Sequence, residues 1–149
     1  MTDIDQGEEI GSGGSATVFK GSCNLNGVKT AVALKYFRSG CNSNVIANEC
    51  NVLRRLSHDN IIQMFSYKPS PRLLILEYCS IIWENNELHN LEEWAKNYYN
   101  RMATVDCRLF KQILSDLNYL HSNNKLHCDM KPSNCSMKND ISGRFWSCI

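Results

Sequence analysis

The 149-residue sequence lacks a strong net charge and any long apolar run. Its formal net charge is +1, which gives no electrostatic footprint for binding nucleic acid or a membrane surface. No apolar segment approaches the length of a membrane span, and residues 1–7 are acidic and polar, unlike a signal sequence. With 43% hydrophobic residues, the chain is predicted to be a globular cytoplasmic domain with no membrane span and no nucleic-acid partner.

The sequence also lacks the paired cysteines of a zinc or redox site. Its eight cysteines contain no Cys-x-x-Cys pair and lie scattered at positions 23, 41, 50, 79, 107, 128, 135 and 148. Such spacing predicts reduced thiols in a cytosolic core. His127, Cys128 and Cys135 imitate part of a zinc cluster, but no fourth ligand lies at metal spacing, so zinc is the weaker interpretation.

What the sequence does contain is a polar segment at residues 127–134, His-Cys-Asp-Met-Lys-Pro-Ser-Asn. Asp129, Lys131 and Asn134 hold the spacing of a phosphoryl-transfer loop, in which an acid accepts a hydroxyl proton, a cation binds phosphate and an amide binds magnesium. A motif of this kind counts only when the remaining machinery occurs upstream in the right order. The upstream sequence therefore decides the interpretation.

Glycines occur near the N-terminus in the segment 10–21, Ile-Gly-Ser-Gly-Gly-Ser-Ala-Thr-Val-Phe-Lys-Gly. Gly11 and Gly13 lie where a backbone has to bend over a polyanion, and the apolar residues that follow predict a strand. Glycine tolerates positive φ and lets N–H groups approach phosphate oxygens. An ordinary hairpin turn is the alternative interpretation of this segment taken alone.

A lysine and a glutamate follow at a spacing of fourteen residues. The apolar alternation of residues 31–36 predicts a strand that carries Lys35, and residues 47–56 predict a helix with one apolar face. Glu49 lies on that face, where a carboxylate is costly without a partner. We therefore predict an ion pair between Lys35 and Glu49, the alternative being a solvated lysine at a strand edge.

The middle of the sequence predicts a core strand followed by helices. Residues 73–79 form an apolar run that ends in Glu-Tyr-Cys, and residues 91–102 and 105–122 show helical periodicity. The second helix leads into the polar segment at 127–134. His58 and His121 are predicted to be structural residues.

In this order the motifs resemble those of a eukaryotic protein kinase, over roughly residues 8–134. The residues around Glu49, residues 56–63 and the Glu-Tyr pair at 77–78 resemble most closely the tyrosine-kinase-like serine/threonine kinases. Within that group they are similar to mitogen-activated protein kinase kinase kinases, including the TGF-β-activated, mixed-lineage and Mos types. Lys-Pro-Ser-Asn at 131–134 resembles serine/threonine kinases more than tyrosine kinases.

The resemblance implies a role for each of these residues. Asp129 accepts the hydroxyl proton of a protein substrate, Lys131 binds phosphate and Asn134 binds Mg²⁺. ATP is the expected phosphoryl donor, and a downstream kinase is the expected protein substrate. Leu76 is the expected gatekeeper beside adenine. The residues expected to bind the nucleotide are Ile10, Gly11, Gly13, Val18, Ala33, Lys35, Glu49, Glu77 and Cys79.

The same resemblance implies an α+β, protein-kinase-like bilobal fold with ATP in the cleft between the lobes. Residues 1–79 are expected to form the complete N-lobe, an antiparallel sheet with one helix, the glycine-rich loop and the hinge. Residues 80–149 are expected to form the first part of the helical C-lobe, through the catalytic loop. The segment 80–90 is expected to be an insertion after the hinge.

The sequence departs from the family pattern at several positions. Ala16 stands where a third glycine is usual, Cys128 where an arginine pairs with a phosphorylated loop, and Ser136 where an apolar residue closes on adenine. Asp-Phe-Gly, whose aspartate is the main Mg²⁺ ligand, occurs nowhere, and Asp140 lies in a turn that makes it a poor substitute.

The chain is therefore expected to be a truncated or partial kinase with little activity by itself. The alternative is a non-catalytic pseudokinase or truncated isoform that acts as a binding or competing partner.

Overall fold

The computed structural model describes residues 3–83, 85–98 and 107–138. These residues form two compact units. The first unit comprises described residues of Met1–Leu56 and Gln63–Tyr78, and the second comprises described residues of Ser57–Ile62 and Cys79–Ile149. Within the described residues, none of the helices has the length and apolar character needed to cross a membrane.

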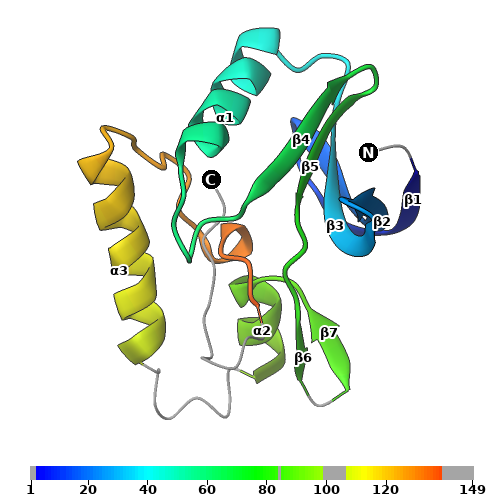
Figure 1. Cartoon of the computed structure of the whole chain (residues 1–149). Coiled ribbons are helices and arrows are strands. Elements are labelled where there is room, and N and C mark those ends of the chain that lie inside the picture. Colours follow the sequence, from blue (N-terminus) through cyan, green and yellow to red (C-terminus); the bar gives the residue numbers. More distant parts are fainter. Residues whose placement is uncertain (1–2, 84, 99–106, 139–149) are drawn as a thin grey trace. The chain divides into compact units, whose positions relative to one another are not determined.

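The first unit is a five-stranded antiparallel sheet with one helix (Figure 1). The strands lie in the order β1-β2-β3-β5-β4, so β5 is flanked by β3 and β4. The strands are β1 (Ile4–Ser12), β2 (Ala16–Leu25), β3 (Val28–Phe37), β4 (Met64–Pro69) and β5 (Arg72–Glu77). Helix α1 (Ser43–Arg55) follows β3 along the chain. The α+β architecture predicted from the sequence is confirmed.

A tight turn joins β2 to β3 and sets their register. Asn26 and Gly27 both have positive φ, 52° and 87°, which Asn-Gly adopts readily in two-residue hairpin turns. The Asn24 side-chain oxygen accepts a hydrogen bond from the Gly27 amide at 2.7 Å. The resulting register pairs Val18 with Lys35.

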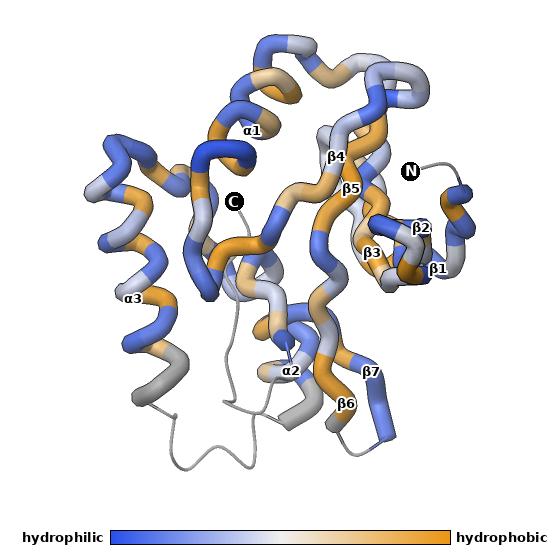
Figure 2. Tube along the Cα trace, in the orientation of Figure 1, coloured by the Kyte–Doolittle hydropathy of each residue, from blue (hydrophilic) through white to orange (hydrophobic). Residues whose placement is uncertain are grey.

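A core cluster of the first unit lies on one face of β2, β3 and β5, and the apolar stretches of β3 and β5 are visible in Figure 2. Its buried members are Cys23, Val32, Leu34, Leu73 and Ile75. Because side chains alternate along a strand, Ala33 and Lys35 of β3 lie on the opposite face from Val32 and Leu34. The sheet thereby holds Lys35 on a rigid element.

Helix α1 begins after Asn42, whose side-chain oxygen accepts a hydrogen bond from the Asn44 amide at 2.8 Å. Arg54 and Arg55 lie in its last turn, where cations interact favourably with the helix dipole. The buried residues of the helix are Ile46, Cys50, Val52 and Leu53. The helix therefore has the apolar face that the sequence predicts, and Glu49 lies beside it.

The described residues of the second unit form a short hairpin, two helices and a 3-10 turn (Figure 1). These elements are β6 (Ile81–Trp83), β7 (Asn86–Leu88), α2 (Leu91–Tyr98), α3 (Cys107–Ser122) and η2 (Pro132–Asn134). The hairpin occupies the segment 80–90 that the sequence marks as an insertion. The ends of the two predicted helices at residues 99–106 lie outside the described residues, as does Asp140.

The start of α2 is capped and tied to the residue after η2. The Glu93 amide donates to Asn90 Oδ1 at 2.9 Å, and Asn90 Nδ2 donates to Glu93 Oε1 at 2.8 Å. Glu93 Oε2 also accepts from the His89 amide at 2.8 Å. The Leu91 amide donates to the Cys135 carbonyl at 2.9 Å, so the chain that follows η2 is anchored on α2.

Candidate phosphoryl-transfer site

The predicted ion pair between β3 and α1 is present. Lys35 Nζ lies 2.5 Å from Glu49 Oε1, and the two side chains are only 21% and 16% exposed. The Lys35 ammonium also lies 5.2 Å from the centre of the Phe37 ring. Partial burial reduces solvent screening of this pair, and losing one partner would leave the other charge poorly compensated.

The strand register brings Lys35 into a row with the glycine-rich segment. Val18 pairs with Gly11 on β1 and with Lys35 on β3, so the three residues lie side by side across three strands. Directly paired residues share a face of the sheet. The sequence predicted all three for the nucleotide site, and the sheet places them together.

A second row contains two further predicted residues. Ala33 pairs with Leu76 on β5, and both are buried. Ala33 lies two residues before Lys35 and therefore on the same face of β3. Ile10 lies at a register irregularity between Glu9 and Gly11, so its position in a row is not set by strand pairing.

The glycine-rich segment forms the hairpin loop between β1 and β2. The Gly13 amide donates to the Ala16 carbonyl at 2.9 Å, which closes the loop. A Cβ atom added to Gly11 or Gly14 would meet no atom within 4 Å, so their backbone is open. Among the described residues only Gly27 is a glycine with positive φ. The loop glycines therefore contribute bare backbone, and left-handed geometry plays no part here.

The predicted hinge follows β5. The Glu77 amide is used inside the first unit, since it donates to the Gln63 carbonyl at 2.8 Å. This amide is therefore unavailable to a base in this arrangement. Cys79, which is buried, belongs to the second unit. The roles of Glu77 and Cys79 in adenine binding stay predictions.

The polar loop gathers the three residues that the sequence singled out. Lys131 Nζ lies 3.0 Å from Asp129 Oδ2, and Asn134 Nδ2 donates to Asp129 Oδ2 at 2.9 Å and to the Asp129 carbonyl at 2.8 Å. The hydrogen bond from Lys131, and after it the one from Asn134, lower the pKa of Asp129 below its usual value. Asp129 is therefore ionised at neutral pH and able to accept a proton.

The backbone around Asp129 has an unusual conformation. Cys128 has φ of +61°, a left-handed conformation that is uncommon for a residue with a side chain. The Asp129 amide donates to His127 Nδ1 at 3.3 Å. Cys128 is exposed and carries no positive charge, so it cannot pair with a phosphate as the usual arginine does.

Sequence reasoning missed Asp116, a buried acid on α3. Asp116 is 1% exposed, and burial raises its pKa to about 7, opposed by the Asn60 side chain. His58 Nδ1 lies 3.4 Å from Asp116 Oδ1, and the His58 ring lies against Tyr119 with centroids 4.7 Å apart. The signal that could have identified it is its place on an apolar helix face, four residues before the buried Leu120.

A magnesium ion fits the described residues only in part. Asn134 uses its amide nitrogen on Asp129, which leaves its amide oxygen as a possible ligand. The described residues contain no group of three or more His, Cys, Asp or Glu side chains suited to a metal. Magnesium requires several oxygen ligands, so Asn134 alone does not make the site.

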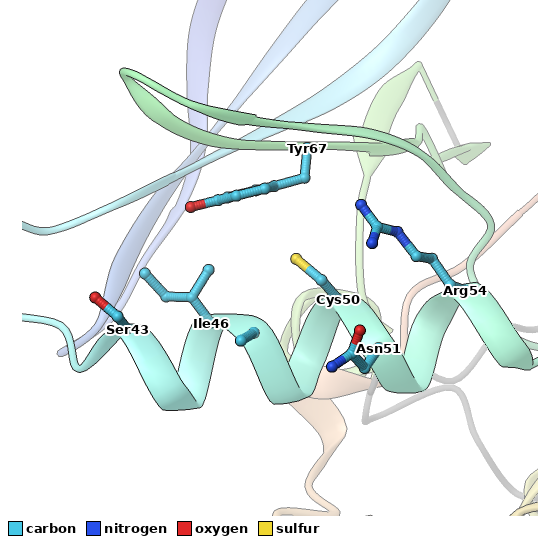
Figure 3. A pocket seen from close by; sticks show the side chains of 7 residues that line it. Ser43, Ile46, Cys50, Asn51, Arg54 and Tyr67 are labelled. Carbon is cyan, nitrogen blue, oxygen red and sulfur yellow. The ribbon is translucent and has the colours of Figure 1, made fainter.

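A cavity of about 210 Å³ lies elsewhere, between α1 and β4 (Figure 3). Figure 3 shows the Tyr67 ring lying across from Ile46 and Cys50, with Arg54 beside it. The cavity is lined by Ser43, Ile46, Ala47, Cys50, Asn51, Arg54 and Tyr67. None of these residues is among those predicted to bind the nucleotide.

Comparison with known proteins identifies the class. The family model for the protein kinase domain matches residues 4–142. The chain belongs to the protein kinase domain family. Its sheet with one helix is that of the kinase N-lobe, and the helices that follow are those at the start of the helical lobe. The predicted assignment of residues 1–79 and 80–149 to the two lobes stays a prediction.

Individual relatives are protein kinases of several kinds. Calcium/calmodulin-dependent protein kinase type IV of Homo sapiens is 32% identical over 128 residues, which cover 85% of this chain and 25% of the relative. Probable serine/threonine-protein kinase fhkE of Dictyostelium discoideum is 35% identical over 139 residues, covering 89% and 18%. Interferon-induced, double-stranded RNA-activated protein kinase of Mus musculus is 28% identical over 156 residues, covering 89% and 28%. The chain thus spans 18% to 28% of the length of these relatives.

Proposed function

We propose that this chain carries the ATP-binding and catalytic-loop residues of a protein serine/threonine kinase. The observation that carries the proposal is the Asp129 carboxylate held by Lys131 and Asn134, in a chain of the protein kinase family. The spacing of these residues is that of a phosphoryl-transfer loop. The Lys35–Glu49 pair supports the proposal from the first unit.

In the proposed reaction the substrate hydroxyl oxygen forms a bond to the γ-phosphorus of ATP. The bond between that phosphorus and the bridging oxygen breaks, ADP leaves, and the hydroxyl proton passes to Asp129. Lys35 binds the α- and β-phosphates and is held by Glu49, while Lys131 offsets charge on the transferring group. When bound, Mg²⁺ neutralises phosphate charge, and Asn134 would be one of its ligands.

We further propose a place within the family. The Lys-Pro-Ser-Asn sequence and the named serine/threonine relative favour serine and threonine as acceptors. The sequence around Glu49 and His58 favours the tyrosine-kinase-like group, similar to mitogen-activated protein kinase kinase kinases. On that basis the substrate is a downstream kinase in the cytoplasm.

A non-catalytic binding role is the second candidate. It is favoured by Cys128, which stands where the usual arginine pairs with a phosphorylated loop. In that role the chain would bind nucleotide or a partner and compete with a complete kinase.

Nucleotide binding tests what the two candidates share. ATP titrated into the 149-residue chain by calorimetry is expected to bind weakly, and Lys35→Ala is expected to weaken it further. Lys29→Ala is the matched control, because Lys29 forms an exposed ion pair with Asp5 on the same sheet at 2.8 Å. Equal binding by the two lysine variants would contradict the proposed nucleotide site.

Phosphoryl transfer separates the two candidates. The 149-residue chain is expected to show no useful transfer to a generic serine/threonine substrate. A chimera that continues after Asn134 with the remaining kinase domain of human calcium/calmodulin-dependent protein kinase type IV is expected to transfer phosphate, and Asp129→Asn is expected to lower its rate about 10²- to 10⁴-fold. A folded, ATP-binding chimera that is silent with Asp129 intact would favour the binding role.

A further inference from the structure

Arg38, the residue directly after β3, makes three hydrogen bonds to the glycine-rich loop. Its backbone amide donates to the Ser15 carbonyl at 2.9 Å. Its side chain donates from Nε to the Gly13 carbonyl at 3.1 Å and from Nη2 to Ser12 Oγ at 3.2 Å. One residue outside the glycine-rich segment thus contacts the last residue of β1 and two of the three residues that connect β1 to β2.

These contacts fix the orientation of a loop peptide. The carbonyl of one residue and the amide N–H of the next point in opposite directions across a trans peptide bond. Holding the Gly13 carbonyl on Arg38 therefore turns the Gly14 N–H away from Arg38. An N–H held in a defined direction is the kind of group that binds a phosphate oxygen at a glycine-rich loop.

We propose that Arg38 is a positioning residue that orders the tip of the glycine-rich loop for the phosphates of a nucleotide. That the ligand is a nucleotide rests on the proposed function. The hydrogen bonds of Arg38 to the loop are observed independently of it. Glycine loses more backbone freedom on ordering than any other residue, and this loop contains Gly11, Gly13 and Gly14. A contact that orders the loop before binding reduces that entropy loss and increases affinity.

The shape of the guanidinium matters as well as its charge. Arginine presents its donors in a planar fork, which here reaches a carbonyl and a hydroxyl together. A lysine ammonium is a single point and reproduces the charge without the fork. Substitution by lysine therefore separates ordering of the loop from simple attraction of phosphate.

The fold supplies a matched control on β5, the strand that pairs with β3. Arg72, the first residue of β5, donates from Nη1 to the Cys41 carbonyl at 2.9 Å. Arg72→Ala removes a guanidinium and a bond to a loop carbonyl, as Arg38→Ala does. Because Cys41 lies outside the glycine-rich loop, Arg72→Ala should leave that loop unchanged.

The first measurement is the ¹⁵N order parameter of the Gly13, Gly14 and Ser15 amides in the 149-residue chain without nucleotide. Arg38→Ala is expected to lower these order parameters, Arg38→Lys to lower them less, and Arg72→Ala to leave them as in the wild type. Equal values in the wild type and Arg38→Ala, with both folded, would overturn the proposal whatever the chain binds.

The second measurement compares ATP with adenosine, which lacks the phosphates. Arg38→Ala is expected to weaken ATP binding about three- to tenfold and to leave adenosine binding unchanged. Equal losses for both ligands, or full recovery of ATP affinity in Arg38→Lys, would overturn a role in ordering the loop. If the wild type bound adenosine and ATP equally, the phosphate site itself would fail, and the order parameters would still decide whether Arg38 holds the loop.

Discussion

Two aspartates of the second unit lie in opposite environments. Asp116 on α3 is 1% exposed, and burial raises its pKa to about 7. The Asp129 side chain is 64% exposed, and the hydrogen bonds from Lys131 and Asn134 lower its pKa. The comparison shows that burial with incomplete pairing favours the proton, whereas exposure with a cation and an amide favours the charge. The second environment keeps the carboxylate ionised at neutral pH, and the lowered pKa also makes it a weaker base.

Glu49 of the first unit is intermediate in exposure between Asp116 and Asp129. Its side chain is 16% exposed, but a lysine on a rigid strand is in direct contact with it. Partial burial strengthens the pair because solvent screens it less, and the same burial makes either partner costly to lose. The three carboxylates therefore differ in burial and in pairing, and substitutions can alter each of these.

The largest effect is expected from removing the buried acid, through Asp116→Asn. A carboxyl whose folded pKa lies near 7 and whose unfolded pKa lies near 3.8 binds more protons in the folded state between these values. Its contribution to stability is complete below about pH 4 and is lost as the pH rises to about 7. The wild type should therefore lose about 2–3 kcal/mol more than Asp116→Asn in free energy of unfolding between pH 5 and pH 8.

The measurement is urea denaturation at the two pH values, with His58→Asn as the control for the neighbouring imidazole. His58 is the control because its Nδ1, which accepts a hydrogen bond from the Asn60 amide at 3.2 Å, lies 3.4 Å from Asp116 Oδ1. Cys135 is the other titratable neighbour, and burial followed by the charge of Asp116 raises the pKa of its thiol. Parallel pH profiles for the wild type and Asp116→Asn would contradict a buried, protonated carboxyl.

The second prediction compares the lysines of the two regions. Lys35→Ala should weaken ATP binding about 10- to 100-fold, since a hydrogen bond to a charged group contributes roughly 1.5–3 kcal/mol. Lys131→Ala should weaken ATP binding less than Lys35→Ala, because Lys131 is assigned to the γ-phosphate, whose charge it offsets during the transfer. Titration calorimetry of both variants checks the contrast. A larger loss in Lys131→Ala would reverse the proposed roles.

The third prediction concerns stability. Glu49→Ala leaves the partly buried Lys35 ammonium without its carboxylate and should lower the free energy of unfolding by about 1–3 kcal/mol. Asp5→Ala, which breaks the exposed Lys29–Asp5 pair, should have a smaller effect than Glu49→Ala. Thermal or urea denaturation at one pH compares them. Equal losses would show that burial does not strengthen the Lys35–Glu49 pair.

Local patterns predicted the elements and residues whose spacing follows from regular structure. The alternation in β3 and the apolar face of α1 predicted the Lys35–Glu49 pair, because a strand and a helix fix where each side chain lies. The sequence indicates the segment 80–90 only as an insertion, since two three-residue strands are too short to show a period.

Other features depend on contacts that sequence does not encode locally. Arg38 binds backbone carbonyl groups of a loop. Because every residue carries a backbone carbonyl, the sequence of the loop does not reveal this contact. The environment of Asp116 depends on the loop that contains His58 and Asn60, which packs on α3. These two residues lie fifty-six or more positions before Asp116 along the chain. An acid on a helix is usually solvated, so tertiary burial was needed to reveal this one.

The smallest expected effect is on the pKa of Asp129, whose two partners can be removed one at a time. Lys131 is the larger cause of the lowered pKa and Asn134 the next, so Lys131→Ala should raise the pKa toward 3.8 more than Asn134→Ala does.

A lowered folded pKa means that the stabilising contribution is present above the unfolded pKa and is lost as the pH falls through the folded one. NMR titration of the Asp129 carboxyl carbon measures both shifts, and Lys125→Ala, in the loop before Asp129, is the control for simple loss of a cation. An equal rise in Lys125→Ala would show that general field effects hold Asp129 ionised. A rise confined to the two partner variants would show that the hydrogen bonds of the loop keep the proton acceptor charged without burial.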